Sequence, residues 1–356
     1  MSVTVAGRLP AEWEPQSAIM LTWPRQDGDF ARAGSDCLQS AEICLASIAA
    51  IISLQQSVLL VIEDDSMAAR LRTMIDDAAG DPDRLIFKQA PADDIWARDH
   101  GPVSVISDGR PLLLNFLFDG WGKRFPADRD NAINKVVHSA GGFADAKMLD
   151  LDRVLEGGAI ESDGEGTLIC TRRWLERCCP APQSLTCYIS FITQLFDIKT
   201  FIILENGEIQ GDDTSGHVDM LVRFANAETL LYQSCEQPAD PHFPGLQALA
   251  VELRKLRRPN GQPFVIHPLP FPGKITGTRG NRLPASYANF LLTNKQVLVP
   301  GFGSPADQEA LEIISGCFPG RQAVSIDSLP LITQGGGLHC ATMHLPAGLL
   351  NRPENP

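Results

Sequence analysis

Six polar side chains of catalytically useful types stand just before runs of apolar residues. They are Asp99, Glu156, His217, Asp219, Asn289 and Cys340. A cysteine together with a histidine suggests nucleophilic catalysis by a thiolate. Nearby carboxylates raise the pKa of a thiol, so they favour this chemistry only when the substrate is itself a cation.

A guanidinium group is the cation that fits such a set best. It is planar and presents five N–H donors, which carboxylates bind bidentately. The residue types therefore predict a guanidinium clamp around a nucleophilic sulfur. Each residue alone also has an ordinary interpretation. Cys340 could be a buried strand cysteine and His217 a structural histidine, while Asp99 could pair with Arg98 and Glu156 could cap a turn.

The elements that must position these residues are predicted from strand–turn–strand patterns. Apolar runs flank turns of Asp, Gly and Asn, which are hairpin signals. A further unit closes if the strand-like ends of the chain pair with each other. The four internal patterns and the two ends are residues 102–116, 158–171, 218–233, 287–302, and 17–24 with 338–346.

Helix-length amphipathic stretches alternate with these hairpins, at residues 38–54, 129–140, 186–196, 243–257 and 305–316. Repeats of this length favour a radial or solenoid arrangement. A ring closed by its own termini leaves no exposed strand edges at the joint. In such a ring the residues that open each unit converge on the axis. The alternative is an ordinary mixed α/β protein whose hairpins recur by chance.

The composition excludes several classes of protein. The 356 residues carry 30 Lys and Arg against 43 Asp and Glu, a net charge of −13, which disfavours a nucleic-acid or anionic membrane surface. Hydrophobic residues at 44% and charged residues at 21% are typical of a folded globular chain. The longest apolar stretches, such as residues 57–62, have strand length, so we expect no membrane span.

The nine cysteines are scattered and form no CxxC pair. Structural zinc needs about four clustered ligands, so we expect no metal site. Free thiols suit a reducing cytoplasm, and the N-terminus lacks the pattern of a signal peptide. We therefore expect a cytoplasmic protein.

The chain resembles the agmatine deiminases and the bacterial peptidylarginine-deiminase-like proteins of the guanidine-modifying (pentein) superfamily. The matching motifs run from Pro10 to Pro346 and include PAEWEPQSAIMLTWP, DDIWARDHGPVSV, VLEGGAIESDGEGTLICT, GDDTSGHVDMLVRF, RLPASYANFLLTN and GGGLHCATMHLP. The resemblance implies an α/β fold, a five-bladed pseudo-symmetric ββαβ propeller formed by residues 1–356 as a single domain. It also implies that no metal or organic cofactor is used.

The resemblance assigns a role to each catalytic residue. Cys340 matches the nucleophile, and His217 matches the general acid and base. Asp99 and Asp219 match the carboxylates that bind the guanidinium. Glu156 resembles the acidic residue that orients the histidine. Together they imply a two-step hydrolysis through a covalent amidino-cysteine.

Other positions are expected around this set. Trp96, Asp213 and Asn289 are expected to bind the substrate: the first two resemble residues of the substrate pocket, and Asn289 lies near the nucleophile in relatives. His339 precedes Cys340 in a strand-like run, so its side chain should point to the opposite face and be structural. The acidic stretch at residues 161–165 is expected at the surface.

The implied reaction converts agmatine and water to N-carbamoylputrescine and ammonia. The ammonium of agmatine would need an acidic or aromatic partner, such as Asp213 or Trp96. A deiminase of free or peptidyl arginine is the main alternative, and Lys123 or Arg124 could bind its carboxylate. This alternative stays open because Ser215 in GDDTSGH, and the short GGGLHC, depart from the usual agmatine deiminase motifs beside the pocket.

Two further classes are an amidinotransferase and a non-catalytic polyamine-binding protein. The motif match to hydrolases disfavours the first. The complete set of Cys340, His217 and Asp219 disfavours the second, since a binding protein needs no nucleophile. The expected partner is a small cationic guanidine, with no nucleic acid and no membrane, and the family suggests a homodimer.

Overall fold

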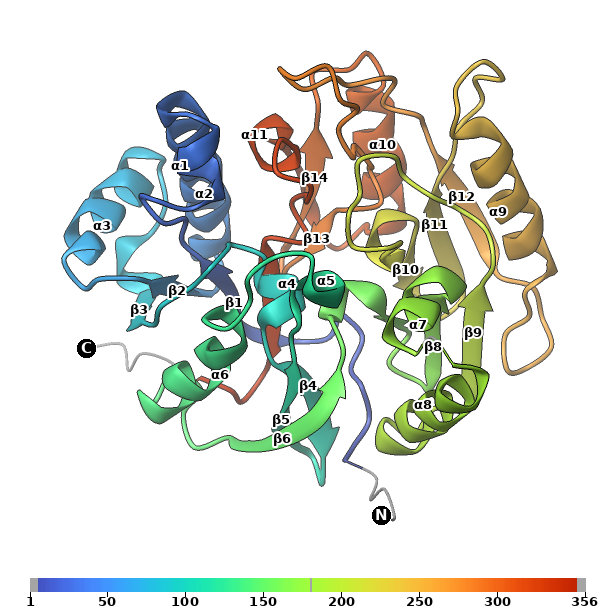
Figure 1. Cartoon of the computed structure of the whole chain (residues 1–356), viewed down its shortest axis with the longest axis horizontal. Helices are drawn as coiled ribbons and strands as arrows, with labels where there is room; N and C mark the ends of the chain where they lie inside the picture. The colour runs from blue at the N-terminus through green and yellow to red at the C-terminus, as the bar shows by residue number, and fades with distance from the viewer. Residues whose placement is uncertain (1–5, 180, 351–356) are drawn as a thin grey trace.

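Five small β-sheets with helices between their strands make up a mixed α/β architecture (Figure 1). The structure is a computed structural model and describes residues 6–179 and 181–350. Within each sheet the first strand is antiparallel to the second, and the second is parallel to the third. The same order of strands is thus built five times.

The strands follow the units expected from the sequence. The four-stranded sheet contains, in spatial order, β16 (Thr342–Pro346), β1 (Gln16–Thr22), β2 (Ser57–Ile62) and β3 (Leu85–Gln89). The next sheets contain β4 (Val103–Ser107), β5 (Arg110–Leu117) and β6 (Lys147–Val154), then β7 (Glu161–Ser162), β8 (Thr167–Thr171) and β9 (Thr200–Leu204). The last two contain β10 (Val222–Asn226), β11 (Thr229–Gln233) and β12 (Val265–Leu269), then β13 (Leu291–Leu292), β14 (Gln296–Gly301) and β15 (Gln322–Asp327).

The predicted hairpins are confirmed. In the turn between β4 and β5, Asp108 and Gly109 have φ of 50° and 73°. Positive φ at both central residues belongs to a type I′ turn, which Asp-Gly favours. The pairing of the chain ends is confirmed too, because β1 lies antiparallel to β16 and Ile19 faces His344.

The five predicted helices are also present. They are α2 (Ser35–Ser53), α6 (Asp130–Ser139), α8 (Pro182–Leu195), α9 (Phe243–Lys255) and α10 (Asp307–Cys317). Helix α8 begins earlier than expected, because Pro182 stands at its first turn, where proline is favoured. The remaining helical elements are α1 (Asp29–Ala33), α3 (Met67–Asp77), α4 (Ala97–His100), α5 (Gly120–Lys123), α7 (Arg172–Cys178), α11 (Leu329–Ile332) and the short turns η1 (Pro82–Arg84), η2 (Gly157–Ala159) and η3 (Val218–Met220).

The longest apolar stretches were expected to have the length of a strand, and helix α2 shows that this was wrong. Its length and apolar composition match those of a membrane-crossing helix, but 56% of the apolar stretch is buried inside the fold. Its buried residues join those of β1 and β2 in one apolar cluster. The helix therefore packs as a core element of the first unit.

A short helix or turn stands ahead of one strand in each sheet. Helix α4 precedes β4, η2 precedes β7 and η3 precedes β10. Turns at residues 287–288 and 338–341 precede β13 and β16. These turns carry the polar residues that the sequence singled out.

Candidate active site

The five turns bring the predicted residues into one buried cluster. Asp99 lies on α4, Glu156 directly before η2, and Asp219 on η3, with His217 immediately ahead of it. His217 Nδ1 lies 3.5 Å from Asp99 Oδ1, and its Nε2 lies 3.7 Å from Glu156 Oε2. Cys340 Sγ lies 3.7 Å from Asp219 Oδ2. Residues that are far apart in the chain, from Asp99 to Cys340, therefore lie close together in the fold.

The sulfur of Cys340 faces a cavity of about 210 Å³, although the residue is only 3% exposed. Burial and the charges of Asp219 and Asp99 raise the pKa of this thiol well above its ordinary value. Asn289 Nδ2 lies 3.3 Å from Sγ and can donate to it. In the free protein the group is thus a thiol, and a cation bound between the carboxylates would favour the thiolate.

Asn289 holds the turn that carries the sulfur. Its Oδ1 accepts hydrogen bonds from the backbone N–H of His339 at 2.9 Å and of Cys340 at 3.4 Å. The residue lies beside the sulfur and does not line the cavity. Its contacts are those of a group that places the nucleophile.

His217 is fully buried between two carboxylates. Burial lowers its pKa, but Asp99 and Glu156 more than reverse this effect and raise it to about 9. Neither ring nitrogen has a hydrogen-bond partner among the described residues. The imidazole is therefore a cation near neutral pH that holds a proton it can give away.

Glu156 is the ionised partner of His217. Burial alone would raise the pKa of this carboxyl group, but His217 and Arg177 lower it to about 2. Arg177 Nη2 donates to it at 2.6 Å, and Trp174 Nε1, from α7, donates at 2.6 Å. Both donors fix its direction, so its charge acts on His217.

Asp99 is held differently. Its Oδ2 accepts a hydrogen bond from Trp121 Nε1 at 3.0 Å, and its Oδ1 accepts one from Gly158 N at 3.3 Å. Burial raises its pKa to about 7, and the charges of Asp219 and Glu156 contribute to this rise. Asp99 is therefore a carboxyl group that a cation would readily bring to its ionised form.

Gly158 is required at this place by contact distance. A Cβ atom there would lie 2.7 Å from His217 Nδ1 and 2.9 Å from Asp99 Oδ1. Real Cβ atoms do not approach other atoms so closely. The second glycine of the LEGG motif thus lets a histidine and a carboxylate pack against the backbone.

Asp219 keeps one oxygen free. Its Oδ2 lies 2.8 Å from His339 Nδ1, while its Oδ1 is buried and has no hydrogen-bond partner among the described residues. Burial raises its pKa, but His339 and His217 outweigh this and lower it. The free oxygen of an ionised carboxylate is suited to accept an N–H from a cationic ligand.

The strand expected around His339 is absent, although its side chain does lie away from the cavity that Cys340 lines. Residues 338–341 form a turn, and the strand begins only at Thr342, so the alternation of a strand does not apply. His339 Nδ1 therefore reaches Asp219, and Nε2 lies 2.7 Å from Glu12 Oε2. Its side chain belongs to the same buried cluster as Cys340.

A second layer of charges behind the cluster was also missed. Arg223 binds Glu12 at 2.9 Å and Glu161 at 3.0 Å, and all three are buried. Glu161 and its neighbours to Asp163 were expected at the surface, and that expectation was wrong for them. The available signals were the first of the two glutamates in PAEWEP and the arginine in HVDMLVRF, but neither identifies its partner.

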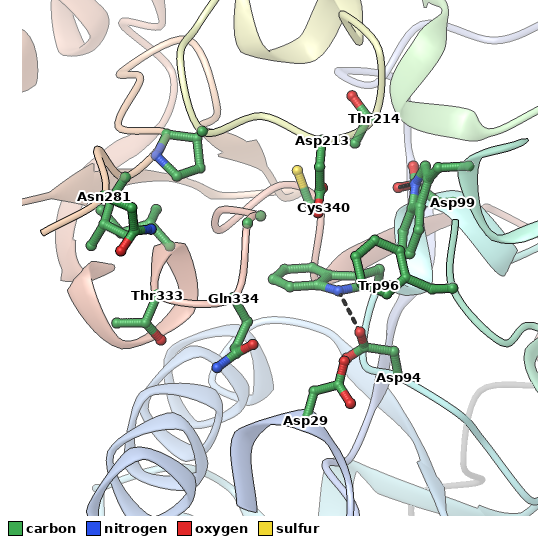
Figure 2. Close-up of a pocket in the computed structure, with 18 of the residues that line it drawn as sticks. Asp29, Asp94, Trp96, Asp99, Asp213, Thr214, Asn281, Thr333, Gln334 and Cys340 are labelled. Atoms are coloured by element: carbon green, nitrogen blue, oxygen red, sulfur yellow. Dashed lines mark hydrogen bonds between the residues drawn. The ribbon is translucent and has the colours of Figure 1, made fainter. Parts of the chain in front are cut away.

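Two of the predicted substrate-binding residues, Trp96 and Asp213, line the cavity, whereas Asn289 does not. The Trp96 ring packs so tightly on Gly336 that a Cβ there would lie 2.4 Å from the ring. Its Nε1 donates to Asp94 Oδ2 at 2.9 Å (Figure 2). In Figure 2 the ring lies between Cys340 and the carboxylates of Asp94 and Asp29, which both line the cavity.

The cavity is strongly acidic. Its walls include four carboxyl groups, those of Asp29, Asp94, Asp99 and Asp213. Burial, with the charge of Asp29 adding to it, raises the pKa of Asp94 to about 7. Burial and the charge of Asp212 raise that of Asp213 to about 6. Asp29 pairs with Arg32, and Asp99 lies 3.5 Å from His217, whereas the side chains of Asp94 and Asp213 form no ion pair among the described residues.

The basic residues near the cavity are engaged elsewhere. Among the described lining residues the arginine is Arg282, whose guanidinium pairs with Asp240 at 2.8 Å. Lys123 and Arg124 are exposed and do not line the cavity, and Arg124 donates to the backbone carbonyl of Asp213. Over residues 6–179 and 181–350, no group of three or more His, Cys, Asp or Glu is arranged to hold a metal ion.

Comparisons with known proteins agree with this chemistry. The family model of Porphyromonas-type peptidyl-arginine deiminases matches residues 8–346. A Selenomonas ruminantium protein assigned as an agmatine deiminase is 31% identical and covers 95% of both chains. A solved structure from Porphyromonas gingivalis, assigned as an arginine deiminase, is 37% identical with a TM-score of 0.87, covering 96% of this chain and 99% of that one. The C. jejuni C315S agmatine deiminase with substrate bound is 28% identical with a TM-score of 0.85, covering 97% of each.

Proposed function

We propose that this chain, which belongs to the Porphyromonas-type peptidyl-arginine deiminase family, hydrolyses agmatine to N-carbamoylputrescine and ammonia. One observation carries this choice of substrate. A cavity lined by four carboxyl groups leads to Cys340, and the arginine in its wall is already paired with Asp240. Such a site favours a ligand that is cationic at both ends.

The guanidinium binds at the inner end of the cavity. Asp99 and the free Oδ1 of Asp219 accept its N–H groups. Its charge offsets the two carboxylates, so that Cys340 loses its proton to solvent and becomes a thiolate. The thiolate and the guanidine carbon then form the S–C bond.

His217 carries the proton transfers. It gives its proton to the departing amino group, the C–N bond breaks, and ammonia leaves an amidino-cysteine. Neutral His217 then takes a proton from water, whose oxygen attacks the same carbon. The S–C bond breaks, the remaining hydroxyl proton passes to solvent as the carbonyl forms, the ureido product leaves, and the thiolate returns. Glu156, at 3.7 Å from Nε2, stabilises the protonated form of His217.

The outer end of the cavity binds the ammonium of agmatine. Asp213, which the sequence indicated, shares the cavity wall with Asp94 and Asp29. The Trp96 ring between the two ends supplies an apolar surface for the carbon chain. The carboxylate of arginine would meet these acidic groups and be repelled.

Arginine is the second candidate substrate. The P. gingivalis protein assigned as an arginine deiminase is 37% identical, above the 31% of the S. ruminantium protein. Arg124 stands next to Asp213 and is exposed, so it could turn toward a carboxylate. The two substrates therefore need a direct comparison.

A substrate screen tests the proposal. Purified protein is incubated with agmatine, arginine and a blocked arginyl peptide, and ammonia and the ureido product are both measured. We expect agmatine to give the highest kcat/KM. Preference for the peptide would overturn the choice of substrate. Transfer of the amidino group to an added amine would indicate an amidinotransferase, and binding without any product would indicate a binding protein.

We further propose that the five sheets are the blades of one closed ββαβ propeller and that the chain is a single domain. The repeated strand order, the pairing of β1 with β16 and the meeting of the five turns support this. The nine free cysteines suit a cytoplasmic location. The expected homodimer can be measured by light scattering.

A further inference from the structure

We propose that His339 is a positioning residue for this reaction, because it fixes Asp219, the carboxylate that lies 3.7 Å from the sulfur of Cys340. The inference rests on the proposed function and extends it to a residue outside the set of nucleophile, acid and guanidinium ligands. His339 is 2% exposed and stands next to Cys340 in the turn 338–341. The turn thus carries the nucleophile Cys340 and, next to it in the chain, a histidine that contacts Asp219.

Both ring nitrogens of His339 face carboxylates. Nδ1 lies 2.8 Å from Asp219 Oδ2, and Nε2 lies 2.7 Å from Glu12 Oε2. A carboxylate only accepts hydrogen bonds, so both contacts form together only when each nitrogen bears a proton. The ring is then an imidazolium that bridges two anions.

Glu12 is a rigid anchor for this bridge. Its Oε1 accepts from the backbone N–H of Leu292 at 2.8 Å, and its Oε2 binds Arg223 at 2.9 Å. Burial would raise its pKa, but Arg223, His339 and Arg98 hold it well below its ordinary value. His339 is therefore held from behind by a fixed charge and can in turn hold Asp219.

The consequence appears at the sulfur. Asp219 Oδ2, which accepts from His339, is also the oxygen 3.7 Å from Cys340 Sγ. The positive ring therefore offsets the carboxylate that most closely opposes the thiolate. The same bond restrains the rotation of Asp219, whose Oδ1 has no hydrogen-bond partner among the described residues.

Two substitutions separate the two contacts. In His339→Asn the side-chain amide nitrogen stands close to the place of Nδ1 and can donate to Asp219. In His339→Gln it stands close to the place of Nε2 and can donate to Glu12. Both variants remove the positive charge and keep one buried hydrogen bond. If His339 only stabilised the fold, the variant that keeps the contact to Asp219 would be no more active than the variant that keeps the contact to Glu12.

We expect His339→Gln to lose about ten- to a hundredfold in kcat/KM, the scale of one hydrogen bond to a charged group. The loss should lie mainly in kcat, since Asp99 still binds the guanidinium while the carbon is misplaced relative to sulfur. His339→Asn should retain at least about fivefold more activity than His339→Gln. Equal losses in the two variants, or better activity of the Gln variant, would overturn the proposal.

His344→Gln is the matched control. His344 lies in the same buried charge layer, with Nδ1 2.9 Å from Arg98 Nη1 and 4.0 Å from Glu12, and makes no recorded hydrogen bond to Asp219. This variant should keep kcat/KM within about threefold of the wild type. A loss as large as that of His339→Gln would mean that any disturbance of the layer slows the reaction, and the proposal would fail.

A measurement without substrate separates this proposal from the proposed function. The rate of Cys340 alkylation by iodoacetamide at one fixed pH is followed by peptide mass spectrometry. We expect the order wild type, His339→Asn, His339→Gln, because Asp219 opposes the thiolate more as its partner is lost. If this order holds in a protein that deiminates no guanidine, the substrate assignment fails and His339 keeps its role. If the wild type is active and the order is absent, the role of His339 fails.

Discussion

At the residue scale, two carboxyl groups near one sulfur differ in charge because their partners differ. Asp219 accepts from a histidine, and its pKa is lowered, whereas Asp99 accepts from an indole and a backbone N–H, and burial raises its pKa to about 7. Neutral donors offset less of the cost of burying a charge than an imidazolium does. The free site is therefore ready to gain affinity for a cation as Asp99 ionises.

Replacing the nucleophile tests the first step. Cys340→Ser should abolish turnover while folding and agmatine affinity stay close to those of wild type, because a hydroxyl is a much weaker nucleophile at neutral pH. Mass spectrometry of wild type quenched during turnover should find the amidino adduct on Cys340. An adduct on another cysteine, such as the exposed Cys187, would show that the assignment is wrong.

The clamp is tested by removing one charge at a time. Asp99→Asn and Asp219→Asn keep the shape of the side chain but lose charge-assisted hydrogen bonds of about 1.5–3 kcal/mol each. Each variant should lose at least about ten- to a hundredfold in kcat/KM for agmatine. Asp150→Asn, whose side chain is 61% exposed, is the control. Full activity of Asp99→Asn on every guanidine tried would contradict the clamp.

The pH dependence follows from two raised pKa values. Asp99 must be ionised, so kcat/KM should rise as pH increases through about 7. His217 must be protonated, so kcat/KM should fall as pH passes about 9. The free-enzyme profile should therefore be bell-shaped between these values. In Asp99→Asn the part of the acidic limb that Asp99 contributes should be lost, while the contributions of Asp94 and of proton loss from Cys340, and the alkaline limb, should remain. An acidic limb that persists unchanged in this variant would assign it to another group.

At the scale of elements, short turns ahead of the first strand of each sheet do the positioning. A turn presents consecutive side chains in several directions, whereas a strand would alternate them between two faces. This lets η3 carry Asp219 toward the sulfur while the preceding His217 contacts Asp99 and Glu156. The glycines beside these residues let the turns approach one another closely.

Gly158→Ala tests this close approach. The added methyl group would lie 2.7 Å from His217 Nδ1, so the histidine or η2 must move, and we expect kcat to fall about tenfold or more. Gly245→Ala is the control, because α9 is helical there and no atom lies within 4 Å of the added Cβ. That variant should keep its activity. Equal kcat values for the two variants would contradict the packing argument.

At the scale of the whole molecule, a buried arginine ties distant parts of the chain together. Arg223 on β10 binds Glu12 and Glu161 and donates to the carbonyl oxygen of Phe290 at 2.6 Å. These partners come from the N-terminal segment, from β7 and from the residue directly before β13. The ion pairs therefore connect several units. They also hold Glu12 in place, and Glu12 in turn contacts His339.

Arg223→Leu should destabilise the protein by about 3–5 kcal/mol, because it leaves two buried carboxylates without their partner. Urea unfolding followed by circular dichroism measures this change. Arg172→Leu breaks the exposed pair with Glu205 and should change stability by less than about 1 kcal/mol. Similar effects of the two substitutions would show that the buried network adds little to stability.

The sequence by itself determined the local elements and the chemistry-bearing positions. Asp-Gly turns between β-branched runs predict hairpins, because φ preferences act within a few residues. The apolar period predicted helices such as α6 and α9 to within two residues. The reactive residues stood out because polar side chains at the start of apolar strands are unusual. These properties depend on neighbours in the chain.

Only the tertiary structure decided which charges meet. His339 was expected on the far face because residues 338–346 resemble a continuous strand, but the contacts of Asn289 with the backbone hold residues 339 and 340 in a turn. Asp29 reaches the same cavity as Asp94 and Asp213, and Glu161 is buried by Arg223. The physical reason is range: charge pairing and burial depend on distances in space between residues far apart in the chain, and no local pattern encodes those distances.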